Sequence, residues 1–366
     1  MKSESEKLRE ILRELPDYVV NFFYAKDSVY QPKTKVAYAI DLRVFLKYLL
    51  EAIPDRFPYP SIAQIPMDAL DHLRPNDIVM FLAYLDEYSM KDADGNYITR
   101  TTPTGKEKIQ VFENSPSGKR RKLASIKAFF KYMVINEYMT KNPATYVDIP
   151  KVPKKPIVAL TESETKRLKK NVQTGAQKTE REKVFFEKTK LRDNAIIMLF
   201  LGTGIRISEL LNIDMYDLDL DEQRLLVRRK GGHTEFVYFK KEVLTALSDY
   251  IELERPVLMK MKSEKEKKAN GPLFVSNRGT RITINRVGQI VKEYGRFVLP
   301  PNVKFSAHLL RKSFGTQLYE RSGGDVSLVQ HALGHADSST TTRFYIDFDK
   351  NRLKFLKDEG DSSDKE

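Results

Sequence analysis

Apolar residues in the first 150 positions recur at the spacing of amphipathic helices. Within the segment 34–50 they fall three or four residues apart, at Tyr38, Leu42, Phe45 and Leu49. The same pattern predicts helices that begin at Pro75 and Lys119, the second of them ended by the Asn-Pro-Ala sequence at 142–144. Between these two helices, residues 92–118 alternate around glycines and prolines, which predicts a long loop carrying a β-hairpin.

The second half of the chain has a mixed pattern. Residues 192–204 predict a buried helix that ends at Gly202 and Gly204. Two short strands are predicted at 225–229 and 235–239, joined by a glycine turn at 231–232. A Thr-Glu-Ser-Glu capping box at 161–164 predicts the start of a helix. Further helices are predicted at 242–254, 285–297, 307–320, 326–333 and 349–357.

A proline-rich segment separates the two halves. Pro150, Pro153 and Pro156 alternate with lysines, and prolines at this density keep a chain extended. We therefore predict a mainly α protein with a small β-sheet or hairpin. Its expected parts are a helical domain at 1–150, a linker at 151–160 and a mixed α+β domain at 161–366 with a frayed polar tail.

The composition favours a polyanionic partner. Lys and Arg total 63 against 50 Asp and Glu, which gives a net charge of +13. Around the helix that begins near Lys119 and in the linker, basic residues form a predicted DNA-binding set, although a simply solvated face would contain the same residue types. The set consists of Lys119, Arg120, Arg121, Lys122, Lys127, Lys151, Lys154 and Lys155.

Several classes of site and location are excluded by composition. The chain has no cysteine, which removes disulfides, thiolate catalysis and Cys-based zinc sites, and its 5 histidines argue against a His-rich metal site. The N-terminus has no apolar stretch of signal-peptide length, and no apolar run approaches the roughly 20 residues of a membrane span. We therefore expect a soluble, cytoplasmic protein without a metal.

Polar residues stand at unusual places in four strings of the second half. Arg206 follows a glycine at the end of one predicted helix, where Ser208 and Glu209 could cap the next helix and orient the arginine. Lys230 lies at the tip of the predicted hairpin. His308 and Arg311 share one face of a helix, and His335 is followed ten positions later by Tyr345. Each has an ordinary structural explanation alone, so their joint order is the informative feature.

That order resembles the tyrosine recombinase family of DNA-cutting enzymes. The matching words are TGIRISE at 203–209, RRKGG at 228–232, HLLR at 308–311, LGH at 333–335 and RFY at 343–345. The likeness covers roughly residues 30–350 and is strongest to Xer recombinases that act as a single protein on a dif-like site, as the ending LGHADSSTTTRFYIDFDKNRL indicates. It implies a two-domain clamp with a helical core-binding domain and a catalytic domain. It also implies double-stranded DNA as partner, a homotetramer on two sites, and no cofactor.

The resemblance assigns roles to six residues. Tyr345 is the implied nucleophile, which forms a 3′-phosphotyrosyl link and releases a 5′-hydroxyl. Arg206 and Arg311 are implied to clamp the non-bridging phosphate oxygens, because guanidiniums bind such pairs bidentately. The resemblance further implies that His335 donates to the phosphate, that His308 assists proton transfer, and that Lys230 is the general acid.

The nucleophile assignment involves a choice of register. Ten positions separate His335 from Tyr345, one more than the family's usual spacing, which would fall on Phe344. An extra residue in the loop ADSSTTT restores the alignment of the flanking residues and favours Tyr345. Tyr319 is the weaker alternative nucleophile.

The biological role has several alternatives at this stage. Resolution of chromosome dimers and the integration or excision of a mobile element use the same residues. A monomeric DNA-relaxing topoisomerase shares the chemistry, and a non-catalytic DNA-binding protein could retain the sequence words. The intact set of six residues argues against the last of these.

Overall fold

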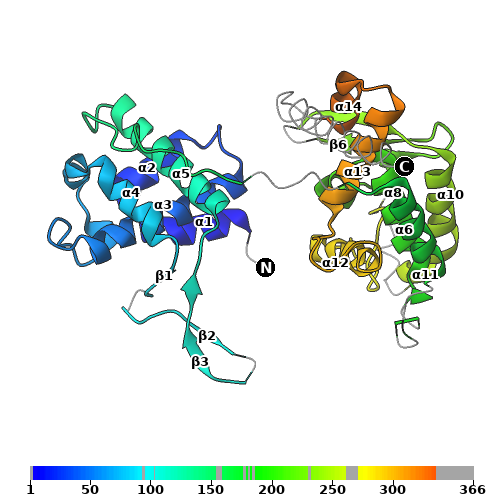
Figure 1. Cartoon of the computed structure of the whole chain (residues 1–366), viewed down its shortest axis with the longest axis horizontal. Helices are drawn as coiled ribbons and strands as arrows, with labels where there is room; N and C mark the ends of the chain where they lie inside the picture. Colours follow the sequence, from blue (N-terminus) through cyan, green and yellow to red (C-terminus); the bar gives the residue numbers. More distant parts are fainter. Residues whose placement is uncertain are drawn as a thin grey trace, which may run out of the picture. The chain divides into compact units, whose positions relative to one another are not determined.

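The computed structural model describes residues 3–92, 95–102, 104–153, 159–175, 179, 182–183, 186–229, 232–260 and 271–334. The chain divides into two compact units, Met1–Lys154 and Lys155–Glu366 (Figure 1). Both units consist mainly of helices with small antiparallel sheets, so the predicted fold class is confirmed. Within the described residues, no helix combines the length and the apolar character that crossing a bilayer requires.

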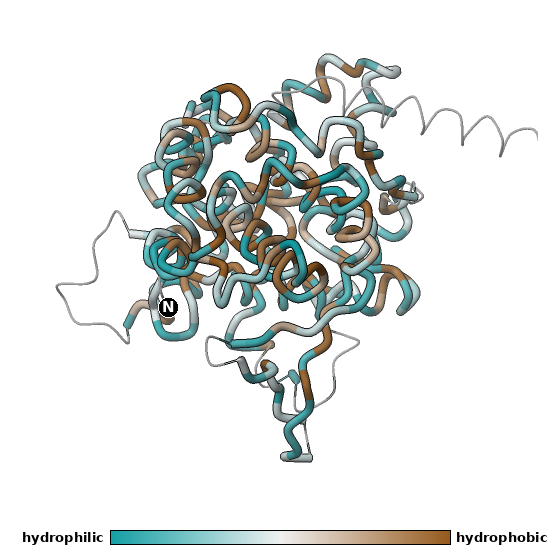
Figure 2. Tube along the Cα trace, turned by 90° about the vertical axis from the view of Figure 1, so that its left-hand side faces the viewer, coloured by the Kyte–Doolittle hydropathy of each residue, from teal (hydrophilic) through white to brown (hydrophobic). Residues whose placement is uncertain are grey.

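The first unit is a helical bundle with a projecting hairpin. Its helices are α1 (Glu4–Leu12), α2 (Asp17–Ala25), α3 (Pro32–Ala52), α4 (Pro75–Tyr84) and α5 (Pro116–Ile135), with 3-10 turns at Ile62–Gln64 and Met67–His72. Buried aromatic and aliphatic side chains of α2, α3 and α5 form the core, including Phe22, Phe45 and Phe130. Figure 2 shows how apolar and hydrophilic positions alternate along these helices.

Helices α1 and α2 were not predicted from the apolar pattern. They precede the first predicted helix in the sequence. The signal for α1 is a capping box, in which the Ser3 hydroxyl accepts from the backbone of Glu6 and the Glu6 carboxylate accepts from the backbone of Ser3. The predicted end of α5 at 142–144 is wrong. The helix ends at Ile135, because Asn136 caps it and Glu137 takes a left-handed φ of 60°.

The hairpin predicted within 92–118 is confirmed. Two short strands at its base, β1 (Tyr88–Ser89) and β4 (Val111–Phe112), pair with each other. Further out, β2 (Thr99–Thr101) pairs with β3 (Glu107–Ile109).

The second unit is built around a buried helix. Helix α8 (Lys190–Thr203) is enclosed by α6 (Glu162–Thr174), α10 (Lys241–Asp249), α12 (Ile284–Gly295) and α13 (Ala307–Arg321). Also present are α9 (Ile207–Leu211), a 3-10 turn at Met215–Asp217, α11 (Arg255–Met259) and α14 (Val326–Leu333). Thr161 caps α6 with the predicted capping box. The helix predicted at 349–357 and the tail lie outside the described residues.

A three-stranded antiparallel sheet completes this unit. Its order is β5 (Leu218–Asp219), β6 (Arg224–Arg228) and β7 (Thr234–Tyr238), one residue earlier for each of the last two than predicted. Leu225 and Val227 of β6 point into the core. By the two-residue alternation of a strand, Arg229 lies on the same inward side.

The single helix predicted at 242–254 is interrupted. A π-helical turn at Tyr250–Glu254 separates α10 from α11, because Pro256 has no N–H group and its ring clashes with the carbonyl four residues earlier. The turn brings the buried Glu254 carboxylate to the start of α8. There it accepts hydrogen bonds from the backbone N–H groups of Leu191 at 2.8 Å and Arg192 at 3.3 Å.

The burial of Glu254 predicts a pH dependence of stability. Desolvation raises the pKa of Glu254 to about 7, against the opposing effects of the two N–H donors and Arg192 and with added repulsion from Asp193. The pKa of Glu254 is higher in the folded than in the unfolded protein. The contribution of the protonated Glu254 to the free energy of unfolding is therefore complete below about pH 4.5 and is lost as pH rises through about 7. Glu254→Gln should therefore gain stability relative to wild type between pH 5 and pH 8, by at most about 3 kcal/mol.

Urea unfolding at both pH values measures this difference. Glu252→Gln changes an exposed carboxylate on the same turn and serves as the control, with an expected difference near zero. An equal stability offset for Glu254→Gln at pH 5 and pH 8 would contradict the prediction.

Candidate active site

The loop that carries Arg206 is shaped by the end of α8. Gly204 adopts a left-handed φ of 62°, and a Cβ there would collide with Phe314 of α13. The chain then turns so that Arg206 becomes the N-cap of α9. The sequence TGIR therefore places a guanidinium directly beside a sharp helix end.

Glu209 fixes the orientation of Arg206. Its carboxylate accepts from the Arg206 backbone N–H at 2.8 Å and forms an ion pair with Arg206 Nη1 at 2.7 Å. Arg206 Nη2 also donates to the carbonyl of Gly334 at 3.1 Å. The predicted orienting role of Glu209 is confirmed, whereas Ser208 is exposed to solvent.

Arg311 reaches the same place from α13 and is only 4% exposed. Its Nη1 donates to the carbonyl of Gly204 at 2.6 Å, and its Nη2 donates to the carbonyl of Leu333. Within the described part of the chain, no carboxylate forms an ion pair with this guanidinium. Burial and, secondly, the positive charge of Arg206 lower the pKa of Arg311 to about 10.

Arg229 is a third arginine at this place, which the sequence analysis did not single out. It is 3% exposed and forms ion pairs with Glu209 at 3.0 Å and Glu235 at 2.8 Å. A Cβ at Gly334 would lie 2.6 Å from Arg229 Nε, so the glycine leaves space for the guanidinium. The available signal was the position of Arg229, two residues after the inward-facing Val227.

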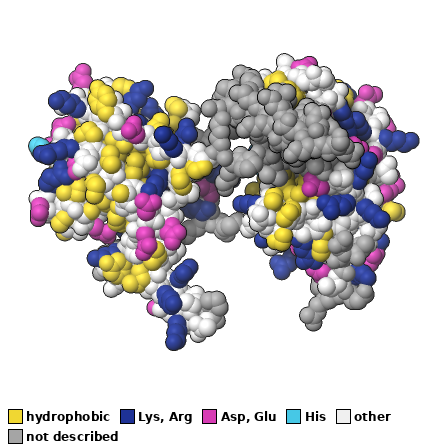
Figure 3. All heavy atoms as spheres, viewed as in Figure 1, with side chains coloured by type: hydrophobic (Ala, Val, Ile, Leu, Met, Phe, Trp, Pro, Cys, Tyr) yellow, Lys and Arg dark blue, Asp and Glu magenta, His cyan; other side chains and the backbone are white. Residues whose placement is uncertain are grey.

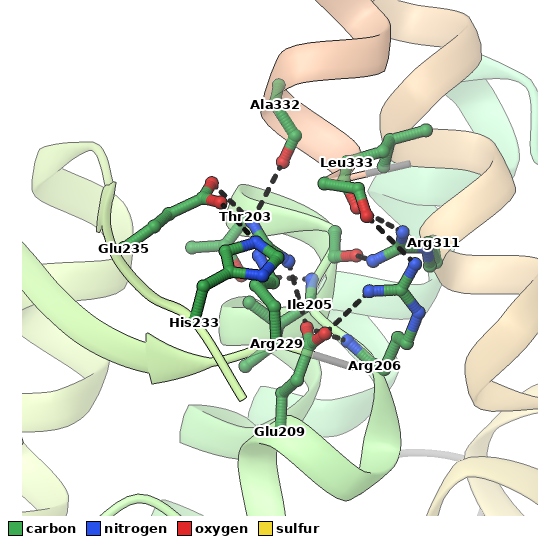
Figure 4. A network of polar contacts seen from close by, with 12 residues as sticks. Thr203, Ile205, Arg206, Glu209, Arg229, His233, Glu235, Arg311, Ala332 and Leu333 are labelled. Atoms are coloured by element: carbon green, nitrogen blue, oxygen red, sulfur yellow. Dashed lines mark hydrogen bonds and ion pairs between the residues drawn. The ribbon is translucent and has the colours of Figure 1, made fainter. Parts of the chain in front are cut away.

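The three arginines converge from separate elements (Figure 4). Arg206 comes from the start of α9, Arg229 from the end of β6 and Arg311 from α13, and carbonyls at the end of α14 accept from the last two. Among the described residues, the carboxylates that pair with them are Glu209 and Glu235. The described site therefore contains three guanidiniums against two carboxylates, an arrangement that suits an anion.

His308 stands one turn before Arg311 on α13. Partial desolvation comes first among the causes that lower its pKa, followed by the positive charges of Lys312, Arg311 and Arg206. The residue as a whole remains exposed. At pH 7 the imidazole is therefore neutral and able to accept a proton.

Comparison with known proteins identifies the family. A model described as "Phage integrase family" matches residues 158–352, which is more than half of the chain. The chain belongs to the phage integrase family. The prediction of a tyrosine recombinase is confirmed by relatives that carry this name.

Two relatives of this integrase-family protein are similar to it over nearly the whole chain. Tyrosine recombinase XerC of Caldanaerobacter subterraneus is 28% identical over 96% of this chain and 86% of that protein. Tyrosine recombinase XerS of Streptococcus agalactiae is 29% identical over 96% of this chain and 98% of that protein. The XerH recombinase in a post-cleavage complex with a palindromic difH substrate has a TM-score of 0.61 at 19% identity, covering 96% and 93% of the two chains. This last likeness shows a shared fold.

Three predicted residues of this integrase-family site, Lys230, His335 and Tyr345, lie outside the described residues. Their neighbours in sequence are described: Arg229 and Gly334 directly precede Lys230 and His335. The alternative nucleophile Tyr319 is partly buried against the small cluster of Val329 and Leu333.

The predicted DNA-binding set needs one correction. Lys122 is 4% exposed and its ammonium is bound to the buried Asp41 at 2.9 Å, so it supports the packing of α5 on α3 and has no surface for phosphate. Arg121 is exposed, whereas Lys119 and Lys127 are partly buried, and all three have partners within the protein. Lys119 pairs with Asp86, Arg121 pairs with Asp41, and Lys127 donates to the carbonyl of Val147. Arg120 and Lys151 are exposed, and Lys154 and Lys155 lie outside the described residues.

The carboxylate shared by Arg206 and Arg229 leads to a stability prediction. Glu209 is 3% exposed, and Glu209→Gln would leave two arginines with less countercharge in a largely buried site. Loss of one member of a buried ion pair typically costs about 3–5 kcal/mol. In a unit of this size we expect the melting temperature of the second unit to fall by about 10 °C, measured by differential scanning calorimetry.

Glu187→Gln is the matched control, because it removes an exposed pair with Lys190. Its expected effect is below about 1 kcal/mol. Equal melting temperatures for the two variants would show that Glu209 does not hold the arginines in place.

Proposed function

We propose that this protein is a site-specific DNA recombinase of the Xer type. It cuts and rejoins DNA strands through a 3′-phosphotyrosyl intermediate on Tyr345. Its partner is double-stranded DNA, which the two domains hold as a clamp, and a homotetramer on two recombination sites is the working assembly. No metal or cofactor takes part, because guanidiniums provide the countercharge for the phosphate.

The observation that carries this proposal is that the buried Arg311 forms no ion pair with a carboxylate of the described residues. A buried guanidinium is normally paired with a carboxylate, since desolvation of an isolated charge costs several kcal/mol. Arg311 instead binds two carbonyls and lies near Arg206, whose charge helps to lower its pKa. A phosphate diester at this place would supply the missing negative charge and accept bidentate hydrogen bonds.

The proposed chemistry conserves the bond energy of the DNA strand. The phenolic oxygen of Tyr345 attacks phosphorus, forming one P–O bond while the bond to the 5′-oxygen breaks. Arg206 and Arg311 stabilise the charge that gathers on the non-bridging oxygens, and His335 donates a further hydrogen bond there. The phenolic proton passes toward His308, and Lys230 gives a proton to the leaving 5′-oxygen.

Two observations support these proton roles. The lowered pKa of His308 keeps its imidazole neutral near pH 7, as a proton acceptor requires. Lys230 directly follows Arg229, whose guanidinium is bonded to Glu209 and Glu235. The residue that directly precedes Lys230 is therefore held in a fixed position inside the site.

The proposed biological role is resolution of chromosome dimers. Relatives named XerC and XerS match 96% of this chain, and the match covers 98% of the XerS protein. Integration and excision of a mobile element is the alternative role that uses the same chemistry. Deletion of the gene separates them, because loss of dimer resolution leaves filamentous cells with unsegregated chromosomes, whereas loss of a mobile-element integrase does not.

The chemistry is tested with nicked suicide substrates drawn from candidate sites in the source genome. On such a substrate the short 5′-hydroxyl fragment diffuses away after cleavage and the protein remains attached to DNA. We expect a covalent adduct that resists denaturant, with the DNA-linked peptide containing Tyr345. Relaxation of supercoiled plasmid without any site requirement would indicate a topoisomerase instead.

A further inference from the structure

The hairpin of the first unit has a firmly held base. Tyr88 of β1 pairs with Phe112 of β4, and their rings lie 5.4 Å apart, with Tyr84 of α4 a further 5.3 Å from Tyr88. Lys47 of α3 donates to the carbonyl of Lys91 at 2.7 Å. The base is thus packed onto the helices, which gives the outer strands a defined direction.

The outer strands have no covering element in the described structure. All six residues of β2 and β3 are exposed, so neither face of this ribbon packs on the helices (Figure 1). The ends of the two strands are nevertheless joined by Thr102, whose backbone N–H and hydroxyl both donate to the carbonyl of Lys106. Because its side chains are exposed, this ribbon contributes little to the hydrophobic core. Its function is therefore expected at the protein surface.

Charge is segregated between the two faces of the ribbon. Arg100 and Lys108 are direct cross-strand partners, and by strand alternation Lys106 lies on their side. The opposite side carries Thr99, Thr101, Glu107 and Ile109. The strand residues on one face are therefore both cations, and the other face contains the single acidic residue of the two strands.

The pairing of Arg100 with Lys108 disfavours the isolated hairpin, since like charges directly opposite each other repel. Within the described residues neither side chain has a carboxylate ion-pair partner. Figure 3 shows basic side chains along the projecting hairpin. An anionic ligand across this face would remove the repulsion.

We infer that the cationic face of the β2–β3 hairpin inserts into the major groove of the DNA duplex. This inference rests on the proposed function and adds a contact separate from the active site. A two-stranded ribbon fits the major groove, which is about 12 Å wide and about 8.5 Å deep. From Ile98 to the turn the hairpin extends roughly 17 Å, long enough to enter it. Arg100 and Lys108 are placed to contact phosphates and base edges there.

Protection of exposed strand edges is the other use of charged residues on a ribbon. Charges of either sign on either face would protect the strand edges equally well. Edge protection therefore does not account for three cations on one side. The net charge of +13 and the nucleic-acid partner proposed for this chain favour DNA over an acidic protein surface as the occupant.

The test compares the full-length double variant Arg100→Gln/Lys108→Gln with wild type. Binding to a single duplex site is measured by fluorescence anisotropy at several salt concentrations. Loss of two phosphate contacts should weaken binding by tenfold or more at 0.1 M salt and reduce the slope of log Kd against log salt by about 1.8. Lys166→Gln/Lys170→Gln on α6 removes the same charge from exposed positions and is the control.

Equal affinities and slopes for the two double variants would overturn the inference. Methylation protection at guanine N7 reports the groove: wild type should protect a guanine that the hairpin variant leaves reactive, and identical protection would contradict major-groove insertion. Unchanged single-site binding with weaker pairing of two sites would mean that the hairpin contacts protein, which also overturns the inference. Failure of wild type to form the covalent adduct would instead count against the proposed function.

Discussion

Tyr345→Phe is expected to abolish the covalent protein–DNA adduct completely while leaving affinity for the site unchanged. Phenylalanine has no hydroxyl oxygen with which to attack phosphorus. Attack by water in its place would form no bond between protein and DNA. The change removes one hydroxyl, so the free energy of unfolding should differ little. Adduct formation on the suicide substrate, resolved on a denaturing gel, measures the effect.

Two further variants decide the register. Tyr319→Phe changes the alternative nucleophile on α13 and should retain full cleavage. Phe344→Tyr combined with Tyr345→Phe moves the phenol by one position and should not restore formation of the adduct. A surviving adduct in Tyr345→Phe that disappears in Tyr319→Phe would overturn the assignment of the nucleophile.

Arg311→Lys is expected to slow cleavage by about 10³-fold, or about 4 kcal/mol of transition-state stabilisation. Lysine retains the charge but has one compact ammonium, which cannot serve both the carbonyls of Gly204 and Leu333 and two phosphate oxygens. One carbonyl would lose its donor, so a stability loss of about 1 kcal/mol should accompany the rate effect. Single-turnover cleavage at saturating protein separates the chemical step from binding.

The same substitution at the end of α13 supplies the control. Arg321 is exposed, and Arg321→Lys should alter neither the cleavage rate nor the melting temperature. Cleavage by Arg311→Lys within tenfold of wild type would show that bidentate contact at this position is not required. The proposed clamp would then depend on Arg206 alone.

Local sequence signals predicted most of the elements that position the site. Gly204 marked the end of α8, and His308 and Arg311 were correctly placed on one helix, because these features depend on neighbouring residues only. The meeting of Arg206 with Arg311 was implied by the family resemblance. It is now seen in their shared contacts with residues 333–334.

Other features depend on partners far along the chain and could not be predicted. Lys122 appeared to belong to a basic surface, but Asp41, 81 positions away, holds it inside the bundle. Arg229 lay within a recognised sequence motif, but its burial depends on Glu209, 20 positions earlier. In both cases a charged side chain is internal because a carboxylate from another secondary-structure element compensates it.

The fit between Arg229 and Gly334 has an evolutionary consequence. Because a methyl group at position 334 would overlap the guanidinium, position 334 can accept a side chain only together with a change at Arg229. Among homologues, a side chain at 334 should occur where a short residue replaces Arg229 and where a different cation compensates Glu209. Divergence at these two positions, 105 residues apart in the sequence, is thus constrained to proceed in matched steps.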